Sequence, residues 1–410
     1  MEIKTKYQYT YFIYPYVIKE EKYEKYITML LHNSNFSLKL FDKDKDEEVY
    51  SYFLPKVRNY MFGSFDYNKS KITKLNEFDN NMKSMLLSKS PCVMFEYKLE
   101  KDIQGKTGIK EGIFFNIRNV EIICFNSGIC FLLIKTTLDE VAKLSDICNF
   151  NYKFRDIYSS KNKLNDYENI KIQTDTLNDI KSISTLIRYI TGNGSYTQNI
   201  NIDSERFITY SYACVGQEYW DNKTKEELLE KEFSKFAVVE PSNSTLDSAR
   251  VLTPQSLKIS NQTMYATTSV STVLLTSDIN TENYTKLPHQ YENQFLYNFL
   301  YELYKKLYLK LISEEFSNSN NFEKTKQYFL NFTKKIWIEE TTNNEIGIEL
   351  SESWENALRI KKLYSEVKRK YDVLYKSKNI EKTAKSNKWI AIILVILVIV
   401  NIINCIKIFK

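Results

Sequence analysis

The spacing of apolar residues in the first third of the chain predicts a β-α-β beginning followed by antiparallel strands. Residues 9–18 are aromatic and β-branched, and Pro15 inside this run favours an edge strand over a central one, because proline donates no ladder hydrogen bond. Apolar positions three and four apart predict helices, and alternating or dense apolar runs predict strands. The predicted helices span 20–31, 47–61, 72–87 and 138–148, and the predicted strands span 36–41, 92–99, 112–118 and 121–135.

A turn signal divides the last of these strands. Residues 126–128 read Asn-Ser-Gly between two apolar runs. Such a sequence is typical of a hairpin turn, so 121–125 and 129–135 are predicted to pair.

The middle of the chain is more polar and predicts a second part of the same sheet. Residues 149–206 are rich in Asn, Lys, Asp and Ser and predict a loosely packed insertion, in which 183–190 form the one clear helix or strand. The next predicted elements are strands at 207–214, 236–240 and 268–276 and a short charged helix at 223–232.

From residue 290 onward the pattern changes to that of three helices. A wide apolar face predicts a helix from 290 to about Phe316, and a second helix is predicted over 322–337. The third begins near Thr342, whose spacing to Glu345 is that of a capping box. No proline follows its start, so it is predicted to run unbroken into the last apolar stretch, over roughly 90 Å at ~1.5 Å per residue.

This third helix carries apolar residues spaced by three and four positions over about two and a half heptads. They are Ala357, Ile360, Tyr364, Val367, Tyr371 and Leu374. The pattern fits a coiled-coil seam between copies of the chain, and it fits equally a face that packs against the two preceding helices of the same chain.

Residues 389–406 predict a transmembrane helix. These 18 residues span roughly 27 Å as a helix, which is close to the hydrocarbon thickness of about 30 Å. Isoleucine, leucine and valine occupy every face, unlike a soluble amphipathic helix. The basic and aromatic residues that fit the water interface before it are Lys382, Lys385, Lys388 and Trp389.

Two polar residues interrupt the predicted span. Asn401 and Asn404 are three positions apart, so their amides lie on one face of the helix. Buried amides in lipid need partners. In one interpretation, they form hydrogen bonds between helices or lie at the headgroup level. In the other, they line a pore in an oligomer.

Charge and the first residues predict the orientation. The chain carries 57 basic and 51 acidic residues, too balanced to indicate nucleic-acid binding. Residues 361–388 hold ten basic residues against three acidic ones, which favours the cytoplasmic side. The N-terminus has no apolar signal-peptide region. We therefore predict a tail-anchored protein in the cell's inner membrane, crossing it once, with a cytoplasmic N-terminal head.

The sequence contains no recognisable catalytic motif. The run Gly105-Lys106-Thr107 lacks the earlier glycine of a phosphate-binding loop, and the acids between Asp42 and Glu48 lack the spacing of a calcium loop. Two histidines and six cysteines without a Cys-x-x-Cys pair predict buried thiols rather than a metal centre. We predict a protein that is not an enzyme, with metals and cofactors left open.

These patterns together predict an α+β fold. An α/β head over 1–148 is followed by a second head segment with the polar insertion over 149–289. A three-helix stalk over 290–388 leads into the transmembrane helix at 389–406.

This order of elements resembles the CorA-type magnesium transporters and their divergent relatives. The resemblance covers roughly residues 290–406, with 297–315 as the helix before the stalk and 342–406 as the stalk and pore helix. That family carries a second membrane helix and a Gly-Met-Asn signature, and this sequence shows neither. The resemblance implies a homo-oligomeric pore as one function. Some divergent relatives are membrane effectors in antiphage defence, whose heads sense a signal.

Two functions are consistent with these patterns and with the resemblance. The first is an oligomeric, CorA-like channel, transporter or effector whose head senses an ion or small molecule. The second is a non-conducting membrane scaffold or sensor that binds partner proteins. Both place the last helix in the lipid bilayer and need no nucleic acid.

Overall fold

The computed structural model divides the chain into two compact units. It describes residues 2–63, 74–99, 103–107, 113–139, 142–157, 171–173, 182–192, 194–198, 202, 205–221, 223–245, 256–260, 262–318 and 322–408. The first unit, called the head here, comprises Met1–Tyr308 and Trp337–Ile360, and the second, called the stalk unit, comprises Leu309–Ile336 and Lys361–Lys410. Residues 72, 73 and 112, and much of the predicted insertion at 149–206, lie outside the described residues.

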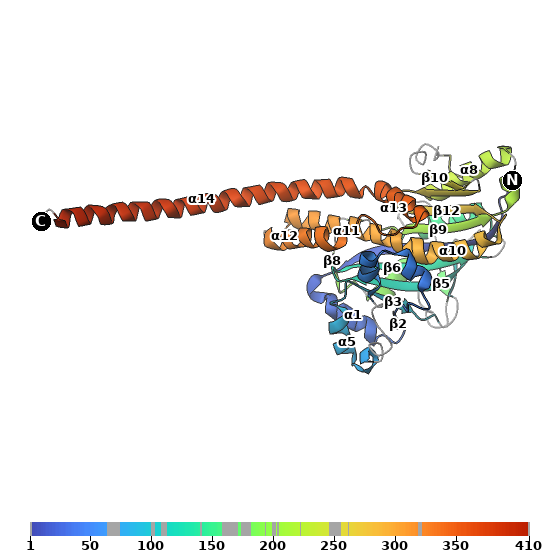
Figure 1. The fold of residues 1–410 in the computed structure, drawn as a ribbon. Coiled ribbons are helices and arrows are strands. Elements are labelled where there is room, and N and C mark those ends of the chain that lie inside the picture. Colours follow the sequence, from blue (N-terminus) through green and yellow to red (C-terminus); the bar gives the residue numbers. More distant parts are fainter. Residues whose placement is uncertain are drawn as a thin grey trace. The chain divides into compact units, whose positions relative to one another are not determined.

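The head is built on one mixed sheet, and the predicted α+β fold is confirmed (Figure 1). Its main path runs β10-β11-β12-β9-β1-β6-β5-β3-β2, with antiparallel neighbours except the parallel pair β12 and β9. β4 extends from β5, β7 from β4, and β8 from β1. The strands are β1 (Thr5–Ile18), β2 (Phe36–Lys39), β3 (Cys92–Tyr97), β4 (Ile103–Thr107), β5 (Ile113–Phe125), β6 (Ile129–Leu138), β7 (Lys171–Gln173), β8 (Thr197–Gln198), β9 (Ile208–Val215), β10 (Ser256–Ser260), β11 (Thr263–Thr267) and β12 (Ser271–Ser277).

β1 is a central strand, so the predicted edge position is wrong. It pairs with β6 on one side and with β9 and β8 on the other. Pro15 is tolerated because the β9 register ends at Ile13 and the β8 register starts only at Val17. The Ile18 N–H donates to the Gly128 carbonyl in the β5–β6 hairpin. Backbone N–H groups alternate between the two sides of a strand, so position 15 faces the other side, in the interval between the β9 and β8 registers. No ladder hydrogen bond is therefore lost at Pro15.

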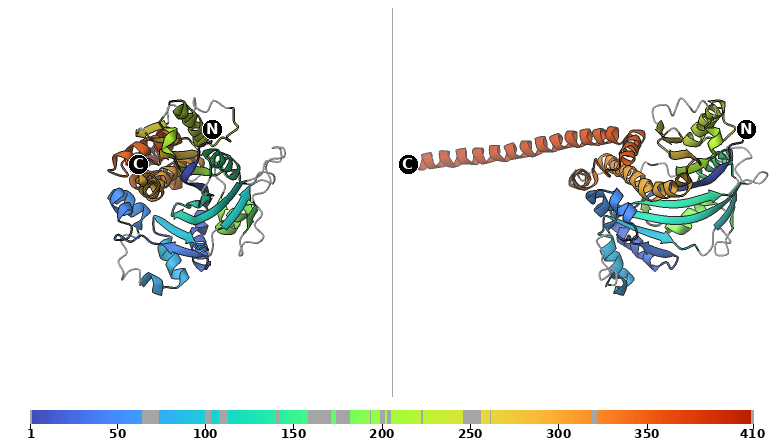
Figure 2. Two further views of the ribbon diagram at one scale, coloured as in Figure 1. Left: turned by 90° about the vertical axis from the view of Figure 1, so that its right-hand side faces the viewer. Right: turned by 45° about the vertical axis from the view of Figure 1, so that its right-hand side comes forward.

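The predicted hairpin is confirmed. β5 and β6 pair from Phe115 opposite Leu138 to Cys124 opposite Cys130, and Figure 2 shows these long strands in the head. Gly128 closes the turn with φ +87°, and its N–H donates to the Phe125 carbonyl at 2.9 Å. A side chain there would run into the Ile18 carbonyl, so the turn requires glycine.

Several helix predictions need correction. The described α-helices of the head before residue 296 include α1 (Tyr23–His32), α2 (Glu47–Tyr52), α3 (Pro55–Met61), α5 (Asn80–Leu87), α6 (Leu144–Phe154), α7 (Ile183–Thr191), α8 (Lys223–Val238) and α10 (Lys286–Gln290). The helix predicted at 47–61 is divided before Pro55, which cannot donate to the preceding turn. The helix predicted from Leu138 begins only at Leu144, since β6 continues to Leu138. Residues 236–238, predicted as a strand, end α8.

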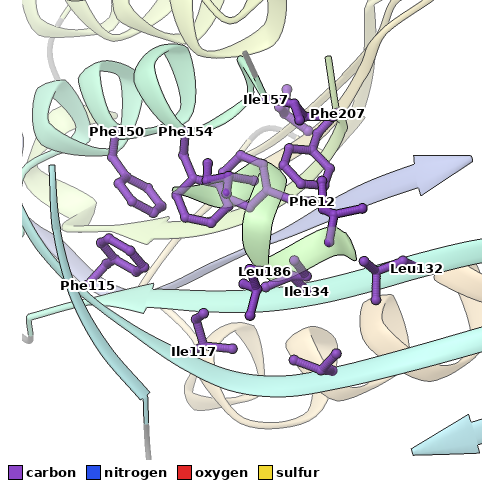
Figure 3. Close-up of a cluster of buried hydrophobic side chains, with 14 of the residues drawn as sticks. Phe12, Phe115, Ile117, Leu132, Ile134, Phe150, Phe154, Ile157, Leu186 and Phe207 are labelled. Carbon is purple, nitrogen blue, oxygen red and sulfur yellow. The ribbon is translucent and has the colours of Figure 1, made fainter. Parts of the chain in front are cut away.

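The hydrophobic core lies between one face of the sheet and α1, α6, α7 and α8. Phe12 is its centre, with ring centroids 4.3 Å from Phe154 and 5.7 Å from both Phe150 and Phe207 (Figure 3). Leu186 and other apolar residues of α7 are buried in the same cluster. Within the predicted insertion, α7 is therefore a core element, because four buried apolar residues at helical spacing anchor it.

The opposite face of the sheet is covered by the helix that begins before residue 296. A π-helical turn, Tyr291–Phe295, leads from α10 into α11 (Leu296–Asn318). Tyr9 donates to the Pro288 carbonyl at 2.7 Å, and Tyr210 donates to the Tyr291 carbonyl at 2.8 Å. These tyrosines fix the helix on the sheet, since a buried hydroxyl is stable only when it is hydrogen-bonded.

The predicted unbroken third helix is wrong. The chain forms α13 (Glu345–Leu358) and α14 (Ile360–Ile408), with Arg359 between them at φ +57°. Asn344, not Thr342, caps α13 by accepting from the Gly347 N–H at 2.9 Å. Thr342 instead donates to the Tyr52 carbonyl at 2.6 Å. A left-handed residue ends a helix locally, and no glycine or proline marks this position in the sequence.

Candidate functional site

The first candidate site is the apolar end of α14. Within the described part of the chain, one helix is long and apolar enough to cross a membrane, and this is the helix. The large apolar side chains from Ile390 to Val400 expose 41–59% of their surface on every face. Exposure of this extent is unfavourable in water, so the segment is suited to a lipid environment.

The residues predicted at the water interface precede this segment in the same helix. Lys382, Lys385 and Trp389 are separated by three and four positions and therefore share one side of α14, with Lys388 beside them. All four are exposed. An indole next to ammonium groups fits the headgroup region, where its ring is half in lipid and its N–H can meet water.

Asn401 and Asn404 lie one turn apart in α14 and are exposed. The structure thus brings the two amides to one side of an otherwise apolar helix. In a bilayer these groups would hydrogen-bond to another helix, to lipid headgroups or to water.

The predicted stalk seam is divided between the two units. Ala357 and Ile360 are buried in the head. In the stalk unit, Phe329 of α12 (Phe322–Asn331) lies 6.2 Å from the Tyr364 ring and 4.6 Å from the Tyr371 ring, both stacked. Val367 is fully buried and Leu374 half-buried. The middle of the seam therefore packs on a preceding helix of the same chain.

A polar cluster that the sequence did not predict joins the sheet to α11. The Lys39 ammonium donates to Glu121 Oε1 and to the Tyr297 hydroxyl, each at 2.9 Å, and Asn119 donates to the same carboxylate oxygen at 2.7 Å. Burial alone would lower the pKa of Lys39, but the Tyr297 phenol and the Glu121 carboxylate outweigh it and raise that pKa. Lys39 therefore stays charged, and its charge is neutralised inside the head.

A second ion pair binds the start of the helix to the sheet. Lys135 of β6 donates to both oxygens of Glu292, at 2.7 and 2.6 Å, and Tyr11 of β1 donates to the same carboxylate. The Lys135 ammonium also lies 4.8 Å from the centre of the Tyr9 ring. The paired carboxylate and the cation over an aromatic face are structural contacts that hold the helix on the sheet.

The head contains a cavity of about 350 Å³ where β2 ends and β3 begins. Most of its lining residues are apolar by type, but polar and apolar atoms share its surface in similar measure. The lining residues are Leu38, Lys39, Leu40, Phe41, Asn59, Met61, Phe62, Gly63, Leu87, Ser90, Pro91, Cys92, Val93 and Met94. Small-molecule sites are concavities of about 300–1,000 Å³, so this cavity has the volume of a site for a small ligand.

The motifs that resembled nucleotide or metal sites are structural. Gly105 lies in β4, tightly packed on the Phe115 ring, and not in a loop that cradles a phosphate. Asp42, Asp44 and Asp46 form a turn in which carboxylates accept backbone N–H groups at 2.8 and 2.9 Å. Over the described ranges, no three His, Cys, Asp or Glu side chains are close enough together to hold a metal ion.

The five cysteines whose side chains the structure describes are buried free thiols, as predicted; the Cys405 side chain lies outside the description. Burial raises the pKa of the thiols of Cys92, Cys130 and Cys148. For Cys214, burial and then the Asp278 carboxylate raise the pKa from 9.0 to about 12, although Lys6 acts in the opposite sense. These thiols are therefore protonated and unreactive near neutral pH.

We expect Cys214 to react with a thiol reagent such as DTNB about a thousandfold more slowly in the native protein than in urea at pH 8, because a pKa higher by three units leaves about a thousandth of the thiolate. A Cys405→Ser background removes the thiol of the apolar tail. Labelled Cys214 is quantified by peptide mass spectrometry. The native rate should still rise about tenfold per pH unit between pH 8 and 10, and a plateau near pH 9 would contradict the raised pKa.

Neither the sequence nor the fold provides a relative from which a function could be transferred. No family model, no curated protein and no solved structure matches the chain.

Proposed function

We propose that this protein is a tail-anchored, single-pass protein of the cell's inner membrane that holds its α+β head on the cytoplasmic side as a binding module. The observation that carries the proposal is the apolar end of α14, from Ile390 to Val400, whose large side chains are exposed on every face. Only a bilayer covers an all-round apolar helix without requiring a specific protein partner.

The flanking charge supports the cytoplasmic orientation. Residues 361–388 carry ten basic and three acidic residues. Basic residues next to a span are retained on the cytoplasmic side, and each one near an anionic surface contributes about 1 kcal/mol of attraction. The head and the basic segment therefore belong to the same side of the membrane.

The packing of the seam supports the scaffold or sensor function over a conducting one. Tyr364 and Tyr371 are stacked on Phe329 of their own chain, so this face of α14 does not need a second copy to cover it. The head then acts as a tethered module that binds a small molecule or a partner protein at the membrane surface.

Protease protection tests this topology. With an epitope tag before the exposed Glu2, we expect trypsin to remove the tag from inverted inner-membrane vesicles and to leave it intact in spheroplasts, since the head faces the cytoplasm. Detergent-lysed spheroplasts serve as the control for cleavage. Digestion in spheroplasts, or loss of the protein from membranes in alkaline carbonate, would contradict the proposal.

A second candidate function is the CorA-like homo-oligomeric pore. The observation that favours it is the pair of exposed amides, Asn401 and Asn404, on one side of the span. In a closed ring of helices these amides would form polar layers that replace part of the water around an ion.

For the pore, we expect the double substitution Asn401→Leu/Asn404→Leu to lower ion flux into liposomes at least about tenfold, because it removes the polar layers while keeping the helix apolar. The matched control, Ile402→Leu/Ile403→Leu, changes neighbouring positions at the same depth and should conduct as the wild type does. Wild-type liposomes that are no more permeable than empty ones would refute the pore and leave the tethered module in place.

A further inference from the structure

The cavity lies beside the first residues of β3, because the pairing of β2 with β3 stops before it reaches them. The register of the two strands ends with Lys39 opposite Met94. Beyond it, the Phe41 ring packs edge-on against Phe62, with centroids 4.6 Å apart, and against Tyr297 at 5.8 Å. These contacts direct the chain toward α3 and α11, so the two strands separate around the cavity.

The hydrogen-bond alternation shows what β3 presents on that side. Across the β2–β3 pair, the backbone N–H of Lys98 donates to the Asn35 carbonyl at 2.7 Å. Backbone groups that bond to β2 recur at every second residue of β3, so they belong to positions 98, 96 and 94, and position 92 would be the next. On the other side, the backbone N–H of Asn126 donates to the Pro91 carbonyl at 3.0 Å. The backbone groups at positions 91, 93 and 95 therefore bond to β5. The N–H and C=O of Cys92 therefore both point away from β5, toward the side that β2 has left.

Cys92 itself lines the cavity. Its backbone N–H and C=O point the same way, so they offer a ligand one donor and one acceptor side by side. Buried backbone groups are nearly always hydrogen-bonded, so this pair favours a ligand that bonds to both. A planar molecule with an N–H next to a C=O matches this pair.

The rest of the lining favours a neutral molecule that carries both polar and apolar atoms. Of the described lining residues, Lys39 alone is charged; its charge is neutralised by Glu121, and it also donates to the Tyr297 hydroxyl. The Cys92 thiol is kept protonated by burial, which raises its pKa. Phe41 and Phe62 close one side of the cavity with rings that are almost fully buried.

We propose that this cavity binds a small, neutral, planar cyclic amide, whose C=O accepts from the Cys92 N–H and whose N–H donates to the Cys92 C=O. Its volume of about 350 Å³ is at the small end of ligand sites, which suits one or two rings. The inference names the ligand site of the proposed binding module, but it does not depend on membrane insertion, because the described lining residues all belong to the head.

The test uses 5-fluoro-2-pyridone, a flat cyclic amide, and fluorine NMR on the full chain in detergent, with empty micelles as the blank. We expect binding with a dissociation constant on the order of 1 mM. The N-methyl derivative has the same ring without the N–H, so it should bind at least about tenfold more weakly. Hydrogen exchange at the Cys92 amide should slow when 5-fluoro-2-pyridone is present.

Two rim variants locate the binding. Asn59 is exposed at the rim, and a Cβ added at Gly63 meets no atom within 4 Å, so Asn59→Trp and Gly63→Phe obstruct the cavity from different segments. Both should abolish binding with unchanged circular dichroism. Lys56→Trp, on α3 but outside the lining, is the matched control and should bind normally.

Three results would overturn the inference. They are no binding of 5-fluoro-2-pyridone to the wild type at about 10 times the expected constant, equal binding of the N-methyl derivative, or normal binding by folded Asn59→Trp and Gly63→Phe. Carbonate extraction of the same preparation reports separately on membrane insertion, so failure of the ligand site is distinguishable from failure of the proposed anchor.

Discussion

Arginine at both Leu397 and Val398 is expected to move the protein from the membrane pellet to the supernatant after a carbonate wash. Residues 389–406 contain thirteen Ile, Leu and Val residues, which together favour insertion by about 4–8 kcal/mol at 0.3–0.6 kcal/mol each. Two arginines at the centre cost about 5–7 kcal/mol and also remove two favourable residues. The balance then no longer favours the bilayer.

The matched control places the same two changes elsewhere in α14. Val373 and Ile380 are 62% and 69% exposed and precede the span, so Val373→Arg/Ile380→Arg should stay in the pellet. If the Leu397→Arg/Val398→Arg protein also remained in the carbonate-washed pellet, the apolar end of α14 would not be the membrane anchor. Both proteins are compared by quantitative blotting of pellet and supernatant.

Lys305→Met is expected to lower the free energy of unfolding of the head by about 3–5 kcal/mol, the usual effect of breaking a buried ion pair. Lys305 and Glu302 lie one turn apart in α11, 2.8 Å from each other, with 5% and 3% of their side chains exposed. Lys305 also donates to the Ile338 carbonyl at 2.8 Å, so it joins α11 to the segment before α13. Urea unfolding followed by tryptophan fluorescence measures the change.

The double variant Lys305→Met/Glu302→Met separates charge from packing. It removes both charges and keeps the side-chain volume, so it should regain most of the lost stability, apart from about 1 kcal/mol for the Ile338 hydrogen bond. Lys326→Met, which removes the half-buried partner of the exposed Glu323 in α12, should change stability by less than about 1 kcal/mol. A double variant no more stable than Lys305→Met would show that packing of the lysine chain, not the ion pair, is what matters.

The local sequence pattern was sufficient to predict a feature when all the residues that form it lie within one segment of the chain. The run from Ile390 to Val400 defined the candidate span, the Asn-Ser-Gly turn defined the β5–β6 hairpin, and the apolar face from residue 290 predicted α11. In each case the interacting residues are neighbours along the chain, so composition and spacing carry the information.

Local pattern failed where a partner distant in the sequence decides the outcome. Pro15 looked like an edge residue, but the interval between β8 and β9 accommodates it in a central strand. Residues 236–238 have strand-like composition, yet they continue α8, whose Phe236 and Ala237 are buried in the core. The strand propensity of these residues is outweighed by the free energy gained when they are buried in the assembled fold.

The sequence by itself determined the α+β class, the candidate membrane helix with its basic flank, and most helices and strands, because these depend on composition and periodicity. Only the tertiary structure decided the ion pairs and the cavity. Lys39 meets Glu121 across 82 positions, and Lys135 meets Glu292 across 157. The cavity forms because Phe41 packs on Phe62 and Tyr297 and draws β2 away from Cys92, and no local pattern encodes a contact between such distant segments.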